Sequence, residues 1–300
     1  MTDLRVRPGT PADSPALFQV FVAAFADLNQ RLNLETAFTQ PAFVEQFWQR
    51  TALLWDYLAH TESRFFVAER NGQIIGYARS IDRDGVRQLT EFFVHPDSQS
   101  AGVGRALLAL AFPAEGIGRR LIIASSDSRA QSLYLKSGVF SRFPIQYFYS
   151  KPEPVYLASD LFFASAADTP DIRAALDRID RAVLGFTRSQ EHTFLLADRA
   201  CYLLYRGGEV VGYTYTGKST GPIALLDPGD FPAVLAYAEN AGAERGDPNL
   251  GIQVPVINRA AVDYLLERGF HMDPLPSHFM SNEPLVNLDR YICTSPPFFI

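Results

Sequence analysis

One glycine-containing segment has residue types and spacing that suit the binding of an anion. Residues 89–94 (LTEFFV) read as an apolar strand that ends at His95-Pro96, because proline cannot continue a hydrogen-bond ladder. Residues 99–104 (QSAGVG) follow and lead into an apolar helix that starts at Arg105. Such a loop leaves several amide N–H groups unpaired at the positive end of a helix dipole. The segment therefore predicts a diphosphate site, with Arg105 adding positive charge beside it.

The two glycines of this loop favour a phosphate ligand but do not prove one. Gly102 and Gly104 let the backbone approach a phosphate closely and adopt angles that other residues avoid. The lysine of a P-loop is missing, which disfavours nucleotide hydrolysis. A dinucleotide fingerprint would follow the first strand of its unit, whereas this segment follows about the fourth. On the glycines alone, a strand–helix turn without a ligand explains the segment equally well.

An internal repeat places this segment within a larger unit. Residues 66–80 (FVAERNGQIIGYARS) and 202–216 (YLLYRGGEVVGYTYT) align at a shift of 136 positions. Each reads as a strand, a tight turn and a second strand. Asn71-Gly72 and Gly207-Gly208 supply the positive backbone angles that two-residue hairpins need.

A second repeated pair follows in the same order. Residues 127–138 (DSRAQSLYLKSG) match residues 258–269 (NRAAVDYLLERG) at a shift of 131 positions. Both read as short helices that a glycine ends, and an apolar strand precedes each. Two matches in one order indicate two copies of one unit, with a boundary near Ser150–Pro154, where two prolines and two charges interrupt the pattern.

The elements expected in the first half form a mixed α/β sheet covered on both faces. The expected strands cover residues 4–7, 63–69, 74–81, 87–94, 121–124 and 140–148. The expected helices cover residues 13–28, 41–59, 104–112 and 128–137.

Composition and charge exclude several classes of protein. The chain has 300 residues, 47% apolar and 20% charged, which is ordinary soluble composition for one large domain or two smaller ones. No apolar run has the ~18 residues of a membrane span. The N-terminus (MTDLRVRPGT) lacks the apolar core of a signal peptide, so a cytoplasmic protein without a membrane partner is expected.

The charged residues, cysteines and histidines argue against nucleic-acid binding and metal binding. The net charge is −6, with 15 basic and 14 acidic residues up to position 150 and 12 and 19 after it. No basic stripe for nucleic acid appears, and the acidic second half is typical of a solvated face. Cys201 and Cys293 fit a reducing compartment. The five histidines show no HxxH or HExxH spacing, so no metal is expected.

The order of motifs resembles a known family. A strand, V-x-P, Q-x-x-G-x-G and a helix, then a strand and a D-x-x-A-x-x-L-Y-x-x-x-G helix, are similar to the GNAT family of acyl-CoA-dependent N-acyltransferases. The resemblance covers about residues 4–148, and the second half resembles a further GNAT lobe. The chain therefore resembles tandem GNAT proteins, an arrangement also found in mycothiol synthase-like enzymes. It implies an α/β fold of two lobes, each a mixed, mostly antiparallel sheet with helices on both faces: a catalytic lobe over residues 1–150 and a degenerate lobe over residues 151–300.

The resemblance also implies acetyl-CoA as co-substrate. The residues 99–104 would hold its pyrophosphate, and the end of the preceding strand would hydrogen-bond its pantetheine arm. The residues so assigned are Phe92, Phe93, Val94, Gln99, Ser100, Ala101, Gly102, Val103, Gly104, Arg105 and Asp127. The family usually has asparagine where Asp127 stands. Val139, where the family usually has phenylalanine, is a packing variation.

Catalysis by such an enzyme needs a base for the acceptor amine and an acid for the departing thiolate. Tyr134 matches the tyrosine of the family that donates this proton, although a tyrosine on an amphipathic helix also packs without catalytic duty. Glu91 is the candidate base, directly or through water, with a surface or salt-bridged carboxylate as the alternative. A backbone N–H near Val94 would stabilise the oxyanion.

Two other reactive side chains are weaker candidates. His95 lies in a V-H-P turn, where a loop histidine without catalytic duty is more usual. Cys201 lies in an apolar strand (CYLLY) without a nearby histidine, which favours a buried structural thiol over a nucleophile. Direct attack by the amine is therefore expected.

The second half keeps the hairpin and the helix after Asn258 but loses both functional parts. Residues 223–239 (IALLDPGDFPAVLAYAE) replace the glycine loop, and Asp227 and Asp230 would repel a diphosphate. Leu265 stands where the first half has Tyr134. This half is therefore expected to be non-catalytic and to shape the acceptor site.

The acceptor is not specified by the sequence. Phe43, Phe47, Leu54 and Leu58 share one helical face and read as core, whereas Trp48 and Tyr57 fall off that face and are free to meet a substrate. A small amine, an amino-sugar, an amino acid and a protein terminus all fit. A non-catalytic acyl-CoA sensor and a scaffold for a protein partner are the alternatives to an enzyme.

Overall fold

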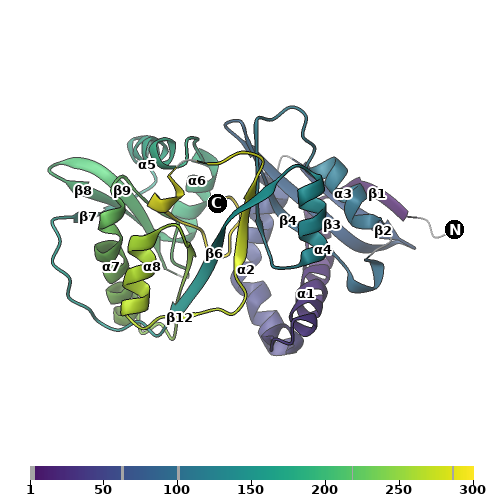
Figure 1. Ribbon diagram of the computed structural model, residues 1–300, viewed down its shortest axis with the longest axis horizontal. Coiled ribbons are helices and arrows are strands. Elements are labelled where there is room, and N and C mark those ends of the chain that lie inside the picture. Colours follow the sequence, from purple (N-terminus) through teal and green to yellow (C-terminus); the bar gives the residue numbers. More distant parts are fainter. Residues whose placement is uncertain (1–3, 62–63, 100–101, 218, 286) are drawn as a thin grey trace. The chain divides into compact units, whose positions relative to one another are not determined.

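The computed structural model describes residues 4–61, 64–99, 102–217, 219–285 and 287–300 (Figure 1). The chain divides into two compact units. Unit 1 comprises Met1–Asp82 and Arg87–Arg120, and unit 2 comprises Arg83–Val86 and Leu121–Ile300. None of the described helices is long and apolar enough to cross a membrane.

Unit 1 has a sheet with the strand order β1-β2-β3-β4. Its elements are β1 (Leu4–Pro8), α1 (Ser14–Arg31), α2 (Pro41–Thr61), β2 (Arg64–Arg70), β3 (Gln73–Arg83), β4 (Val86–Val94) and α3 (Val103–Ala111). Phe65, Val67 and Tyr77 share one face of the sheet and pack with residues of α1 and α2. On the other face, a Cβ at Gly76 would lie 3.3 Å from Cδ1 of Leu107, so this glycine lets α3 pack closely.

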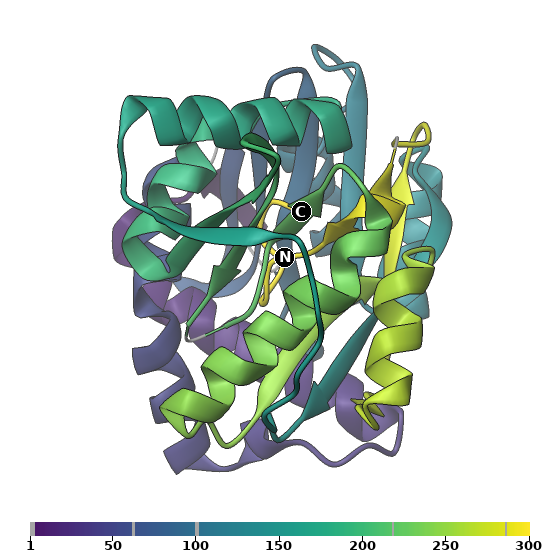
Figure 2. The ribbon, with the colours of Figure 1, turned by 90° about the vertical axis from the view of Figure 1, so that its left-hand side faces the viewer.

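Unit 2 contains strands of two sheets, with the orders β5-β13-β6-β11 and β14-β10-β9-β8-β7, and β12 also pairs with β6. Its strands are β5 (Arg119–Ala124), whose first two residues belong to unit 1, β6 (Phe140–Ser150), β7 (Phe162–Ala166), β8 (Ala200–Arg206), β9 (Glu209–Thr216), β10 (Ile223–Leu225), β11 (Leu250–Pro255), β12 (His271–Met272), β13 (Ser277–Ser281) and β14 (Tyr291–Ile292). Its helices are α4 (Ser128–Lys136), α5 (Pro170–Val183), α6 (Ser189–Asp198), α7 (Phe231–Arg245) and α8 (Arg259–Glu267). Helices α7 and α8 pack side by side (Figure 2).

Strands from both halves of the sequence interleave in unit 2. β13 pairs with β5 on one side and with β6 on the other, and β6 also pairs with β11. The compact units therefore divide the chain near residue 120, whereas the sequence repeat divides it near residue 150. The expected α/β class with mixed, largely antiparallel sheets is confirmed.

The repeated hairpins have the same strand register. Ala68 pairs with Gly76 in the β2–β3 hairpin, and Leu204 pairs with Gly212 in the β8–β9 hairpin. In both, the register shifts at the next residue. The positions of the two irregularities differ by the 136 residues of the sequence repeat. The duplication therefore includes a β-bulge, which is a specific structural feature and not a defect of the hairpin.

The repeated helices α4 and α8 begin and end in the same way. Oδ1 of Asp127 accepts a hydrogen bond from the backbone N–H of Arg129 (2.9 Å), and Oδ1 of Asn258 accepts one from Ala261 (3.1 Å). Gly138 and Gly269 follow the two helices with φ of 79° and 78°. Side-chain N-caps and left-handed glycines are sufficient to fix both ends of these short helices.

Candidate functional site

The glycine loop leads into α3 as the sequence predicts. Gly102 is the N-cap residue of α3 and has a φ of 82°, which favours glycine. No side chain in the described part of the loop caps the helix, and a Cβ at Gly102 would meet no atom within 4 Å. The first turn of α3 is therefore open to an anion, with Arg105 exposed beside it. Ser100 and Ala101 lie outside the described residues.

Gln99 ties the loop back to the end of β4. Its side-chain Nε2 donates a hydrogen bond to the carbonyl of Val94 (3.0 Å). This contact uses one lone pair of a carbonyl in the strand end, Phe92–Val94, that the resemblance assigns to the pantetheine arm. The next amide, that of His95, donates to the carbonyl of Ile75 on β3 (2.8 Å). Gln99 thus has an observed structural role in the loop, and its contact with a coenzyme stays a prediction.

Glu91 on β4 is largely buried and has two partners on β3. Oε1 accepts a hydrogen bond from the hydroxyl of Tyr77 (3.3 Å), and Oε2 lies 3.2 Å from Nη1 of Arg79. The carboxylate is 13% exposed, whereas Arg79 is 0% exposed. Burial raises the pKa of Glu91, and the charge of Arg79 and the Tyr77 hydrogen bond partly offset this. A carboxylate with a raised pKa is suited to accept a proton near neutral pH.

An aromatic cluster of unit 1 surrounds this part of the sheet. It consists of Phe18, Phe21, Phe25, Phe38, Phe43, Phe47, Trp48, Trp55, Tyr77 and Phe93. The ring of Phe93 lies 5.1 Å from that of Phe21, so this β4 side chain is part of the packing. The ring of Trp48 lies 4.8 Å from that of Phe18, so Trp48 also packs here rather than standing apart from the core.

Tyr134 and Asp127 lie on the α4 segment of unit 2. Tyr134 is 5% exposed, and burial together with the nearby Asp127 raises the pKa of its phenol. The phenol therefore keeps its proton at neutral pH, as a proton donor must. Asp127 uses its carboxylate to cap α4 and lies 3.4 Å from Nη2 of Arg129.

The weaker candidates have structural surroundings. Nδ1 of His95 accepts a hydrogen bond from the N–H of Asp97 (3.4 Å) within the loop that follows β4. Cys201 is buried, and burial raises the pKa of its thiol to about 12. A thiol with so high a pKa is a poor nucleophile at neutral pH, as expected of a buried structural thiol.

The equivalent segment of the second half differs from the glycine loop in its charged side chains. Oδ1 of Asp227 accepts a hydrogen bond from the N–H of Gly229 (2.8 Å), and Asp230 forms an ion pair with Arg206 (2.6 Å). Leu265, which matches Tyr134, is fully buried in the core of unit 2. These carboxylates occupy the start of α7, where the first half leaves the start of α3 open.

The C-terminal segment, residues Tyr291–Ile300, fills the space between β10 and β11. Ile292 of β14 pairs with Ile223 of β10. The N–H of Cys293 donates to the carbonyl of Gln253 on β11 (3.0 Å). Phe298, Phe299 and Ile300 are buried. This end of the chain is therefore a built-in part of the second sheet, which the repeat pattern did not reveal.

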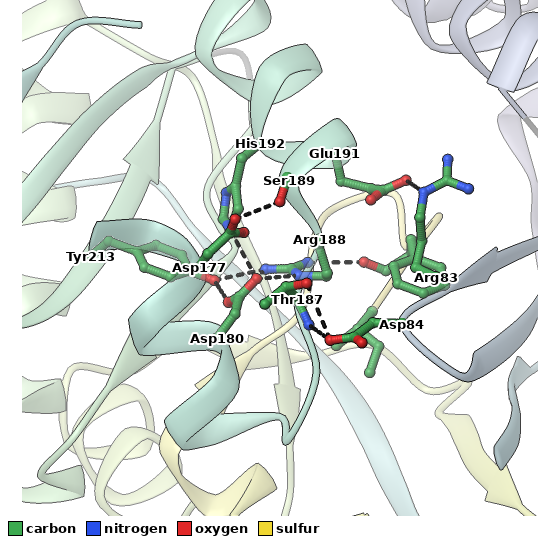
Figure 3. Close-up of polar contacts among 12 residues, drawn as sticks. Arg83, Asp84, Asp177, Asp180, Thr187, Arg188, Ser189, Glu191, His192 and Tyr213 are labelled. Carbon is green, nitrogen blue, oxygen red and sulfur yellow. Dashed lines mark hydrogen bonds and ion pairs between the residues drawn. The ribbon is translucent and has the colours of Figure 1, made fainter. Parts of the chain in front are cut away.

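A fully buried polar network joins the C-terminal segment to α5, α6 and β9 (Figure 3). Asp180 accepts hydrogen bonds from Nε of Arg188 (2.8 Å) and from the hydroxyl of Tyr213, and lies 2.8 Å from Nε2 of His192. Nη1 of Arg188 donates to the carbonyl of Phe299 (2.9 Å). Sequence reasoning missed this network. Tyr213 gave the one available signal, because it matches Tyr77, which also donates its hydroxyl to a carboxylate.

Beside the network, two contacts hold residues of the β3–β4 turn (Figure 3). Arg83 forms an ion pair with Glu191 (3.0 Å). Asp84 accepts a hydrogen bond from the N–H of Thr187 (3.0 Å). These contacts explain why residues 83–86 cluster with unit 2.

Comparison with family models finds one match, within the first half of the sequence. Residues 61–139 match the family model of the acetyltransferase (GNAT) domain. This stretch contains Glu91, the glycine loop and Tyr134. No curated protein matches the chain by sequence.

Solved structures share the fold over nearly the whole chain. A GCN5-related N-acetyltransferase from Sphaerobacter thermophilus aligns with a TM-score of 0.58 at 16% identity, covering 95% of this chain and 98% of that one. A tandem GNAT protein from the clavulanic acid biosynthesis pathway aligns with a TM-score of 0.57 at 15% identity, covering 94% and 99%. A Pyrococcus horikoshii protein described as an acetyltransferase gives 0.68 at 15% identity, covering 96% and 92%. Residues 61–139 therefore match the GNAT acetyltransferase domain, and the whole chain has the fold of a tandem GNAT protein.

Proposed function

We propose that the protein is an N-acetyltransferase that moves the acetyl group of acetyl-CoA to the amine of an acceptor. The observation that carries this proposal is the open, glycine-capped start of α3 directly after β4, within residues that match the GNAT domain. In the proposal, the first half of the sequence, residues 1–150, is the catalytic lobe, and residues 151–300 form a degenerate lobe.

The residues present fit the pyrophosphate of a coenzyme. Gly102 has the left-handed φ and the absence of a Cβ that let phosphate oxygens reach the amides of the first turn of α3. Arg105 is exposed next to these amides and adds a positive charge. The bound coenzyme supplies an activated thioester, and the chain supplies the proton transfers.

Two side chains are assigned to those transfers. As the acceptor amine attacks the thioester carbon, Glu91 takes the proton that the amine loses, directly or through water. The C–N bond forms, the C–S bond breaks, and Tyr134 donates its phenolic proton to the departing thiolate. The buried surroundings of both groups, which raise both pKa values, support these assignments.

Three features support a single catalytic lobe. Carboxylates of Asp227 and Asp230 stand at the start of α7, Leu265 replaces the proton donor, and the C-terminal segment occupies the space between β10 and β11. An incoming coenzyme arm would have to displace the strand pairing of Ile292 and the hydrogen bond of Cys293. At the positions that match the glycine loop and Tyr134, the described part of the second half thus offers neither an anion site nor a proton donor.

A panel of amines tests the proposal. The purified protein, acetyl-CoA and each amine in turn are assayed for release of free thiol, with the acetylated product identified by mass spectrometry. We expect amine-dependent thiol release that falls by about 10²–10⁴-fold in Glu91→Gln, the usual contribution of a general base. The control Glu69→Gln removes a carboxylate that pairs with Arg7 in the same unit (2.7 Å) and should keep the wild-type rate. Binding without turnover on any amine would favour a sensor, and absence of binding would favour a scaffold.

A further inference from the structure

The most unusual charged group outside the assigned machinery is Arg79 on β3. It is fully buried, and none of its Nε, Nη1 and Nη2 atoms has a hydrogen-bond partner in the described part of the chain. A buried guanidinium is rarely left without hydrogen bonds, so its retention needs a reason. The matching position in the second half is Tyr215, an uncharged residue of the polar network.

Aromatic rings take the place of hydrogen bonds around this guanidinium. Its Cζ lies 4.3 Å from the ring centroid of Phe65, 5.4 Å from that of Trp55 and 5.7 Å from that of Tyr77. Cation–π contacts of this kind stabilise the positive charge, and they leave the guanidinium able to form an ion pair with a carboxylate. The ion-pair capacity of Arg79 is thus directed at one acid, Glu91, whose Oε2 lies 3.2 Å from Nη1 and has no hydrogen bond of its own.

Glu91 depends on this single cation. Tyr77 and Arg79, both on β3, are the titratable and charged groups that act on its carboxylate in the described part of the chain. From α1 and α2, the side chains that pack on this sheet face are aliphatic and aromatic, among them Phe21 and Trp55. Without Arg79, burial in such surroundings would favour the protonated carboxyl.

We propose that Arg79, itself held among the rings of unit 1, is a positioning residue that keeps the Glu91 carboxylate ionised and in place beside Tyr77. The inference rests on the proposed function, because an ionised Glu91 is what accepts the proton of the amine. This role of Arg79 explains why a buried charge without hydrogen bonds is retained in the first half. The second half has no catalytic base in the proposal, and it has Tyr215 at the matching position.

The test measures the ionisation of Glu91 directly. Carboxyl ¹³C NMR of ¹³C-glutamate-labelled protein, with Glu91→Gln to assign the signal, gives the pKa of Glu91 in wild type and in Arg79→Met. We expect the pKa to rise by about one to three pH units in Arg79→Met, the usual effect of a neighbouring arginine. Arg79→Lys restores the charge and should return the pKa most of the way. Tyr77→Phe removes only a hydrogen bond and should shift it less than Arg79→Met does.

Activity gives the second readout. The acidic limb of the kcat/KM profile should shift to higher pH in Arg79→Met by the amount seen by NMR. An unchanged Glu91 pKa in Arg79→Met would overturn the inference. A shifted Glu91 pKa with an unshifted kcat/KM profile would confirm the role of Arg79 but show that Glu91 is not the base. Failure of the inference and failure of the proposed function are therefore distinguishable. If Arg79→Met does not fold, Arg79→Gln replaces it. If neither neutral variant folds, Arg79→Lys alone is measured. A rise of more than one unit in the Glu91 pKa in that variant would contradict a role that depends on charge.

Discussion

Replacing Tyr134 with phenylalanine is expected to lower kcat by about 10²–10⁴-fold while acetyl-CoA still binds with unchanged affinity. The change removes one oxygen from a side chain that is almost wholly buried, so packing of α4 is retained. It also removes the proton for the departing thiolate. Because burial and Asp127 raise the pKa of this phenol, the wild type should show no loss of activity from its ionisation up to pH 10. Steady-state thiol release and calorimetric binding measure the two effects separately.

The repeat offers a matched control for this variant. Tyr264 lies on α8, the counterpart of α4, and its hydroxyl donates to Oε1 of Glu239 (2.5 Å). Tyr264→Phe makes the same chemical change in the half that is proposed to be non-catalytic, and should leave kcat near the wild-type value. A Tyr134→Phe enzyme with full activity, or equal losses in both variants, would show that Tyr134 is not the proton donor.

Replacing Asp180 with asparagine is expected to destabilise the protein by about 3–5 kcal/mol. The side chain keeps its shape but loses its charge, which leaves Arg188 buried with no carboxylate partner. The hydrogen bonds from Tyr213 and His192 to Asp180 weaken as well. Because Arg188 also holds the carbonyl of Phe299, the C-terminal segment should loosen in the same variant. Urea unfolding followed by circular dichroism measures the loss, and hydrogen exchange of residues 291–300 measures the loosening.

An exposed ion pair near the start of the same helix is the control for Asp180. Asp168 pairs with Arg173 at the start of α5, and both side chains are solvent-exposed. Asp168→Asn should therefore change the stability little, since exposed pairs are screened by water. Equal effects of Asp168→Asn and Asp180→Asn would contradict the importance of the buried network.

The contribution of Asp180 should also depend on pH. Burial alone would raise its pKa, but Arg188 and His192 more than offset this and hold the pKa below the ordinary 3.8. A carboxyl whose pKa is lower in the folded state stabilises the fold above its unfolded pKa. The difference in stability between wild type and Asp180→Asn should thus be full above about pH 4 and shrink as the pH falls further. A difference that grows on acidification would contradict the assigned charge.

Local patterns in the sequence predicted the elements of the first half well. Every helix and strand expected there has bounds within three residues of those in the structure. The success has a physical basis, because proline, glycine and the apolar period fix element ends locally. The repeat was also readable, since hairpin glycines and helix-ending glycines recur at fixed shifts. Glu91, the start of α3 and Tyr134 could be named for the same reason.

Long-range pairing could not be predicted in this way. The insertion of β13 between β5 and β6 joins residues that are more than 130 positions apart, as Phe279 and Phe143 are. The pairing of Ile292 with Ile223 of β10 and the hydrogen bond from Arg188 to Phe299 also join residues that are far apart in the sequence. Arg79 reads as an ordinary strand arginine until the rings that enclose it are known. Strand order and buried polar contacts depend on the whole fold rather than on any local window.

The most direct test of the central claim is a calorimetric titration with acetyl-CoA of the wild type and of a Gly102→Asp/Gly104→Asp variant. The variant places two carboxylates at the start of α3 and a side chain at a position with a φ of 82°. Gly208→Asp is the control, because Gly208 is also left-handed and faces open space, in the hairpin turn of the second half. We predict one site per chain in the wild type and in Gly208→Asp, and no binding in the double variant. Two sites per chain would contradict the single catalytic lobe, and a folded wild type that binds no acetyl-CoA would contradict the transferase itself.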